Sequence, residues 1–177
     1  MTRNSALLAV LGLLGAAPPE AHAGEDDKAL SADVAFAMFT AGDHLRPLGG
    51  VLTLEYERGL SQSFSLRAAV GGGILYEDGT DDLAPGLVWR GQAVAGLVYL
   101  VDILKYVPYA TICLGVVTRG GDPIETDVYP VLEIGGGLDL LQSRTFSWGG
   151  FARMSSYLDD DAAFSLGARA TWRWSLF

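Results

Sequence analysis

The sequence predicts an all-β fold, an eight-stranded antiparallel up-and-down transmembrane β-barrel. Apolar and polar residues alternate with period two in eight stretches of about 10 to 14 residues, and helical periodicity is almost absent. Strands of about 9 to 11 residues cross a bilayer at a tilt, whereas most strands of soluble proteins have about 5 or 6 residues. The connections alternate between short turns and longer acidic loops, which is the pattern of a membrane-spanning barrel.

The first four strands carry apolar residues at every second position, with small or charged residues between them. This alternation is expected when one face of a strand contacts lipid and the other lines a filled interior. In chain order these strands are 32–41 with Val34, Phe36 and Met38, 49–58 with Leu52, Leu54 and Tyr56, 64–76 with Phe64, Leu66 and Val70, and 88–101 with Trp89, Ala93 and Leu97.

The last four strands follow the same pattern with one exception. The fifth, 107–117, is apolar on both faces, so alternation does not show which of its residues face lipid. The others are 128–140 with Leu132, Ile134 and Leu138, 145–157 with Phe146, Trp148 and Met154, and 163–176 with Phe164, Leu166 and Trp172. The chain ends in "TWRWSLF", where Trp172, Trp174 and Leu176 share the outward phase and Phe177 does not.

Two kinds of connection join these strands. Short turns are expected at 58–63, 102–106 and 141–144, and longer loops at 42–49, 77–86, 118–127 and 158–162. The longer loops contain most of the acidic residues. With an even number of strands, both ends of the barrel domain lie on the side of the short turns.

Charged residues on the inward phase are balanced in sign. They are Asp33, Glu55, Glu57, Glu133 and Asp139 against Arg67, Arg90, Arg153, Arg169 and Arg173. Because unpaired buried charge is costly, such a set in a narrow lumen predicts a network of salt bridges and hydrogen bonds that plugs it. The expected partners of Arg173 are Asp139 and Asp33. The alternative is a lumen that conducts ions or binds a substrate.

Hairpin geometry gives a check on the inward phase. Facing residues of an antiparallel pair lie on the same face and have a constant index sum. The expected turn between the sixth and seventh strands gives a sum near 286, which pairs Glu133 with Arg153. The turn between the second and third strands gives a sum near 122, which pairs Glu55 with Arg67. Both predicted pairs are opposite in charge.

Aromatic residues on outward phases gather near the strand ends in two belts. Near the short turns these are Tyr56, Phe64, Tyr99, Phe146, Trp148, Trp172 and Trp174, and near the longer loops Tyr76, Trp89 and Phe164. Aromatic belts of this kind lie where a barrel meets the lipid headgroups. A soluble lipocalin-like barrel would instead have its polar phase outside and its apolar phase inside.

The first 23 residues precede the barrel and have the pattern of a cleaved signal peptide. Arg3 comes before an apolar run of 12 residues, and Ala21 and Ala23 provide small residues at the positions that a signal peptidase reads. The run is shorter than the about 20 residues that a spanning helix needs. We therefore expect export with cleavage after Ala23.

With these features the chain resembles the small outer-membrane β-barrels of Gram-negative bacteria, the eight-stranded class that includes the OmpA transmembrane domain and OmpX. The resemblance rests on the segment ending "AHA", the eight strands, the terminal strand "FSLGARATWRWSLF" and the stretch "VDILKYVPYATICLG". It implies insertion by the outer-membrane assembly machinery, which reads a C-terminal strand ending in Phe, and contact with outer-membrane lipids. The expected organisation is a signal peptide at 1–23, a short periplasmic N-terminal segment at 24–31 and an outer-membrane barrel, expected to be a monomer, at 32–177.

Composition excludes several other classes. The net charge of −9 argues against nucleic-acid binding, which needs a basic face. Cys113 is the single cysteine, so it forms no intramolecular disulfide, and we interpret it as a small buried hydrophobe. The glycine clusters at 71–73 and 135–137 open no helix and match no phosphate-binding fingerprint, so no cofactor is expected. In barrels, glycine allows curvature and close packing beside bulky inward residues.

The expected role is non-catalytic, either structural or in surface interaction. One alternative is a pore for ions or small solutes. Another is a lipid-modifying enzyme that uses His44, which follows Asp43 in the first long loop, although no third group stands at a recognisable spacing. The stretch "EDGTDD" resembles a calcium loop but lacks the distal Glu, so we expect a solvated acidic surface and no metal site.

Overall fold

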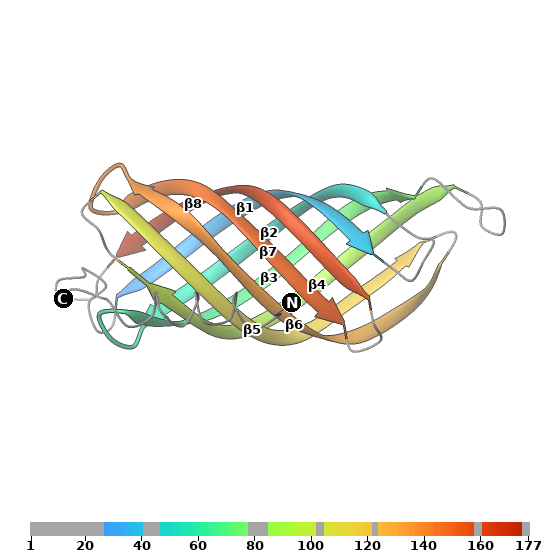
Figure 1. Ribbon diagram of the computed structural model, residues 1–177, viewed down its shortest axis with the longest axis horizontal. Coiled ribbons are helices and arrows are strands. Elements are labelled where there is room, and N and C mark those ends of the chain that lie inside the picture. Colours follow the sequence, from blue (N-terminus) through green and yellow to red (C-terminus); the bar gives the residue numbers. More distant parts are fainter. Residues whose placement is uncertain are drawn as a thin grey trace, which may run out of the picture.

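The computed structural model describes residues 27–40, 47–77, 85–101, 105–121, 124–157 and 161–174. These ranges form a closed barrel of eight antiparallel strands, in which each strand pairs with its sequence neighbours and β8 pairs with β1 (Figure 1). The strands are β1 (Lys28–Thr40), β2 (Leu48–Gly59), β3 (Phe64–Glu77), β4 (Gly86–Leu100), β5 (Tyr106–Gly121), β6 (Ile124–Leu141), β7 (Phe146–Tyr157) and β8 (Ala162–Trp174). Within the described ranges, no helix is long and apolar enough to cross a membrane. The predicted fold class is confirmed.

The strands close with a stagger that tilts them. Following paired residues once around the barrel, from Lys28 to Arg58 and on through the other strands, leads back to β1 at Met38, ten residues further along. For eight strands about 4.8 Å apart and a rise of about 3.3 Å per residue, this stagger gives a tilt of roughly 40°. The interior of such a barrel is just wide enough for side chains to fill it.

The barrel has two unlike ends. At the turn end, short connections join β2 to β3, β4 to β5 and β6 to β7, and at the loop end the other four connections join the strands. Two of the short turns are built alike. The backbone N–H of Phe64 donates to Ser61 Oγ (3.2 Å), and that of Phe146 donates to Ser143 Oγ (3.0 Å).

The predicted registers of the β2–β3 and β6–β7 hairpins were wrong, because the index sum of facing residues is larger by two in each. Gly59 faces Ser65 and Leu141 faces Ser147, so the sums are 124 and 288. The reason lies in the turns: the carbonyl of Phe64 accepts from two successive N–H groups, which moves the turn centre one residue further along the chain, and the second turn is built the same way. A change of two keeps every side chain on its predicted face.

Three strand boundaries also lie four residues away from expectation, at the start of β1, the end of β5 and the start of β6. β1 begins at Lys28, four residues earlier than expected. β5 and β6 continue into the segment 118–127, which we expected to be a loop, because Arg119 faces Asp127 across the hairpin. Facing residues of opposite charge extend the pairing past the apolar part of both strands. Apolar alternation therefore does not reveal this extension.

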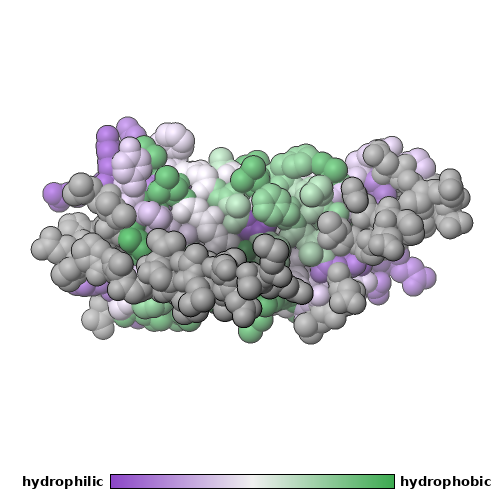
Figure 2. All heavy atoms as spheres, viewed as in Figure 1, coloured by the Kyte–Doolittle hydropathy of each residue, from purple (hydrophilic) through white to green (hydrophobic). Residues whose placement is uncertain are grey.

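The outer surface of the barrel is apolar over most of its length. Val34, Leu114 and Val128 are each more than 60% exposed, and large hydrophobic side chains point outward from all eight strands. Figure 2 shows hydrophobic residues over the middle of the visible face and polar residues toward both ends. A contiguous surface of this kind is suited to lipid, which leaves the polar side chains for the interior.

Candidate functional site in the barrel lumen

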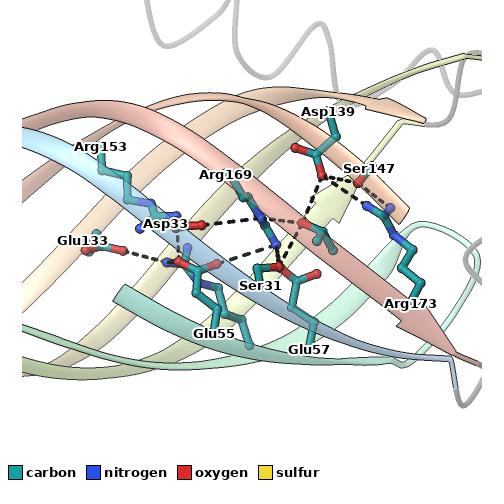
Figure 3. A network of polar contacts seen from close by, with 12 residues as sticks. Ser31, Asp33, Glu55, Glu57, Glu133, Asp139, Ser147, Arg153, Arg169 and Arg173 are labelled. Atoms are coloured by element: carbon teal, nitrogen blue, oxygen red, sulfur yellow. Dashed lines mark hydrogen bonds and ion pairs between the residues drawn. The ribbon is translucent and has the colours of Figure 1, made fainter. Parts of the chain in front are cut away.

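The lumen has two parts that differ in the side chains that fill them. From the turn end to the middle, charged and hydroxyl side chains point inward and contact one another (Figure 3). Toward the loop end the inward side chains are mainly apolar. The first part, called the ion-pair network below, consists of Ser31, Asp33, Glu55, Glu57, Arg67, Glu133, Asp139, Ser147, Arg153, Arg169, Thr171 and Arg173.

Glu55 on β2 is the centre of the ion-pair network. Its fully buried carboxylate pairs with Arg67, with Arg153 (Oε1 to Nη2, 2.6 Å) and with Arg169 (Oε2 to Nη2, 3.6 Å). Arg67 faces Glu57 across the hairpin and reaches Glu55 along the diagonal. The three arginines come from β3, β7 and β8, so one carboxylate links four strands.

The remaining acids near the middle of the lumen share these arginines. Asp33 pairs with Arg153 and lies 4.0 Å from Arg169 Nε. Arg67 lies 3.4 Å from Glu133 on the opposite wall. Each of these arginines therefore contacts two or more carboxylates, which compensates charges that are buried in the lumen.

Arg169 on β8 connects the charged groups to the hydroxyl groups. It pairs with Glu57, donates from Nη2 to Ser31 Oγ (2.8 Å) and donates from Nε to Thr171 Oγ1 (3.1 Å). Its Cζ lies 4.8 Å from the ring centroid of Tyr109, which packs on the guanidinium as a cation–π partner. The side chain is held on all sides by protein groups.

Arg173 ends the ion-pair network at the turn end. Its Nη2 lies 3.1 Å from Asp139 Oδ2, and its Nη1 donates to Ser147 Oγ (2.6 Å). The side chain of Arg173 is 28% exposed, whereas that of Asp139 is 1% exposed. The network therefore meets solvent at this pair.

Two glycines of β6 make room for the bulky groups of the lumen. A Cβ at Gly135 would lie 2.7 Å from Cγ of Arg153, and a Cβ at Gly137 would lie 2.6 Å from the hydroxyl oxygen of Tyr109. Both distances are too short for any other residue. The glycine cluster at 135–137 thus serves close packing beside inward side chains, as expected.

The second part of the lumen, called the apolar layer below, lies toward the loop end. Phe39 and Tyr157 stack across it, with ring centroids 6.1 Å apart and planes 6° apart. Every strand contributes at least one side chain. The members are Ala37, Phe39, Val51, Ala69, Leu75, Val88, Val94, Cys113, Val117, Val131, Tyr157 and Ala163.

Arg90 is buried in the lumen but stands apart from the ion-pair network. Its Nη2 donates to Gln92 Oε1 (2.6 Å), and its Cζ lies 4.9 Å from the ring centroid of Phe39. Among the described residues, no carboxylate forms an ion pair with it. This buried guanidinium is supported by an amide and an aromatic ring within the apolar layer.

Another ion pair, missed by the sequence analysis, lies at the loop end of the lumen. Arg119 Nη2 lies 2.9 Å from Asp161 Oδ2, and the guanidinium packs on Tyr129 with Cζ 4.7 Å from the ring centroid. Both charged residues fall in segments that we expected to be loops. Because alternation left the phase of the fifth strand open, it did not indicate that Arg119 points inward.

The predicted partners within the lumen need two corrections. Glu133 does not face Arg153, and its ion pair is with Arg67. Asp33 pairs with Arg153, and not with Arg173. Glu133 does not face Arg153 because the turn after β6 changes the register, so that Arg153 faces Gly135. The observed ion pairs join strands that are not hairpin partners, because long arginine side chains reach across the lumen to these acids.

The ten predicted girdle aromatics lie on the outer face near the strand ends. Eight of them are 40–53% exposed. The other two are half-buried because Tyr99 packs on Phe64 and Phe146 packs on Trp172, with ring centroids 5.2 Å and 5.0 Å apart. Tyr106 is a further member of the turn-end belt, missed because the phase of the fifth strand was not assigned.

Several predicted features lie outside the described residues. These are the signal peptide at 1–23, His44, most of the acidic loop residues and Phe177. Cys113 is described and is buried, which agrees with its interpretation as a small hydrophobe. Within the described part of the chain, no three His, Cys, Asp or Glu side chains are grouped so as to hold a metal ion.

The comparisons with known proteins define the class of the fold. No family model and no curated protein matches the sequence. The structure of Neisserial surface protein A matches with a TM-score of 0.64 at 14% identity, over 82% of this chain and 96% of that chain. Ail, the attachment invasion locus protein of Yersinia pestis, matches with a TM-score of 0.57 at 16% identity, over 85% and 99%. Its complex with the heparin analogue sucrose octasulfate matches with a TM-score of 0.54 at 18% identity, over the same shares. The chain thus has the fold of the small eight-stranded outer-membrane β-barrels, which confirms the resemblance.

Proposed function

We propose that the chain is a non-catalytic integral protein of the bacterial outer membrane, with a lumen closed by its own side chains. The supporting observation is the division between an apolar outer face with aromatic belts and an interior of buried ion pairs. Lipid is the solvent that suits this outer face. Inside, the charges of the ion-pair network are paired with one another, so side chains rather than an open channel occupy the lumen.

The role is structural or in surface interaction through the loop end. The loop segments of the sequence are rich in Asp and Glu. Ail has been solved with a polyanionic heparin analogue, but an acidic loop end repels polyanions. We therefore propose that any surface partner of this chain is cationic or neutral.

Delivery to the membrane follows from the same proposal. The signal peptide at 1–23 directs export, the assembly machinery inserts the barrel, and the closed sheet leaves no strand edge that requires a second copy. The protein is then a monomer in contact with outer-membrane lipids, with its loop end outside the cell.

Membrane fractionation with gel electrophoresis tests the proposal. We expect the protein in the outer-membrane fraction, and we expect an unheated sample to migrate differently from a boiled one, because a closed barrel resists unfolding by detergent at room temperature. Recovery in the soluble fraction together with identical migration of both samples would contradict the proposal.

Two further measurements address the pore and the enzyme. We expect no single-channel conductance in planar bilayers, and stable channels would favour the pore. We expect His44→Ala to leave lipid A unchanged by mass spectrometry, and a changed lipid A product would favour the enzyme.

A further inference from the structure

The two parts of the lumen differ in how well they tolerate water and ions. We propose that the apolar layer, and not the ion-pair network, is the barrier to ions and small solutes, and that the network is a hydrated chamber reached only from the turn end. This inference rests on the proposed function, because the barrier separates two compartments only if the barrel spans a membrane.

The apolar layer is continuous around the lumen. Its members come from all eight strands, and none is more than 7% exposed. Phe39 stacks on Tyr157 within the layer, and Tyr129 packs against the layer with its ring centroid 6.4 Å from that of Tyr157. An ion that enters such a constriction loses its hydration without gaining polar partners, so apolar constrictions stop ions by excluding water.

The ion-pair network has the opposite character. Six of its buried polar atoms have no hydrogen-bond partner: Asp33 Oδ1, Glu55 Oε2, Arg67 Nε and Nη1, Asp139 Oδ1 and Arg153 Nε. Within the apolar layer, the atoms of this kind are Arg90 Nε and the hydroxyl oxygen of Tyr157. Buried polar atoms are nearly always hydrogen-bonded to protein or to water. Water is therefore expected among these side chains, and the exposed edge of Arg173 gives it an entrance at the turn end.

Arg90 strengthens the barrier against cations. Its guanidinium is buried among members of the apolar layer, and among the described residues it forms no ion pair. A fixed positive charge in apolar surroundings repels cations over several ångströms, because little water screens it. Arg90 thus adds a repulsion that acts on cations, whereas the exclusion of anions depends on the apolar side chains alone.

Cys113 is a natural reporter for this arrangement because it lies at the boundary of the two parts. It belongs to the apolar layer, is 1% exposed and faces Glu133 of the ion-pair network across β5 and β6. It is also the single cysteine of the chain. A reagent that enters from the turn end reaches Cys113 through the chamber, whereas a reagent from the loop end must first cross the apolar layer.

The experiment compares three variants of the full chain in planar bilayers and oriented vesicles. Leu75→Ser with Val117→Ser makes the apolar layer polar and smaller. Ile74→Ser with Val116→Ser makes the same change on the lipid side of the same strands. Arg173→Gln opens the chamber at the turn end without altering the layer. The readouts are conductance and the rate at which a small charged methanethiosulfonate labels Cys113 from each side, with heat-modifiability as the check of folding.

We expect the layer variant to conduct and to be labelled from the loop end about tenfold faster than the wild type, because water then enters the constriction. The lipid-side variant should behave like the wild type. Arg173→Gln should be labelled faster from the turn end only and should not conduct. If the double layer variant does not fold, Val117→Ser with Val116→Ser as its control provides the same comparison.

The outcomes separate this inference from the proposed function. A wild-type barrel that conducts ions contradicts the proposed closed lumen. A closed wild type with a conducting Arg173→Gln variant overturns the inference, because the ion pairs would then be the barrier. Folded layer variants that neither conduct nor become labelled from the loop end also overturn it.

Discussion

Glu55 is the residue on which the ion-pair network depends most, because three arginines share its buried carboxylate. Glu55→Gln keeps the size of the side chain and removes its charge, which leaves buried guanidinium groups without compensation. We expect the free energy of unfolding to fall by about 3–5 kcal/mol. Urea titration of the barrel in lipid vesicles measures this change.

The control for this substitution is Glu125→Gln, at an exposed position near the loop end, with an expected change within about 0.5 kcal/mol. Equal urea midpoints for Glu55→Gln and the wild type would show that the arginines do not depend on this carboxylate.

Gly137 shows how tightly the lumen is packed around a single ring. A Cβ at this position would lie 2.6 Å from both the hydroxyl oxygen and Cζ of Tyr109. We expect Gly137→Ala to destabilise the barrel by about 1–3 kcal/mol through overpacking. The same titration measures it, with Gly50→Ala as the control, because a Cβ at Gly50 would meet nothing within 4 Å. A larger effect at Gly50 than at Gly137 would contradict this account of the packing.

At the scale of the element, β8 shows the two faces of a membrane strand in adjacent residues. Ala168 is exposed on the outer face, and Arg169 is buried in the lumen. Ala168→Arg places a charge in lipid near the middle of the strand, which we expect to cost about 2–4 kcal/mol. Leu60→Arg, in the turn after β2, should cost much less because it lies beyond the strands. Equal costs for both substitutions in vesicle titrations would show that the outer face does not contact lipid.

Alternation predicts well which face of such a strand contacts lipid. A lipid-facing side must be apolar, whereas a side that carries charges must point into the lumen. It fails for β5, where Cys113 and Val117 belong to the apolar layer and Val107 at the turn end is also buried and apolar, which leaves no contrast between the faces. Alternation also does not give the register, which depends on how the turn at Phe64 is hydrogen-bonded. The partner of Glu133 could not be predicted either, since it depends on the stagger of the whole barrel.

At the scale of the whole molecule, the net charge of the sequence comes from the segments that join the strands at the loop end. In the sequence, the charges just before and at the start of β1 and around the short turns, Glu25, Asp26, Asp27 and Asp102 against Lys28, Arg58, Lys105 and Arg144, are balanced in number, and so are the ten predicted lumen charges. The longer connections and the strand ends next to them contain eleven acids against Arg46 and Arg119, which accounts for the whole net charge of −9. The acids are Asp43, Glu77, Asp78, Asp81, Asp82, Asp122, Glu125, Asp127, Asp159, Asp160 and Asp161. The sequence therefore predicts a barrel that is polarised along its axis.

This polarity predicts the charge of what binds to the loop end. We expect a fluorescent oligolysine to bind vesicles of neutral lipid that carry the barrel with its loop end outward. Binding should weaken as ionic strength rises from about 0.01 M to about 0.15 M, because the Debye length falls from about 30 Å to about 8 Å. Asp81→Asn with Asp82→Asn should reduce the binding, and Asp102→Asn at the turn end should not. A sulfated polysaccharide that binds as well as oligolysine, or oligolysine binding that is insensitive to salt, would show that the acids of the loop end do not control recognition there.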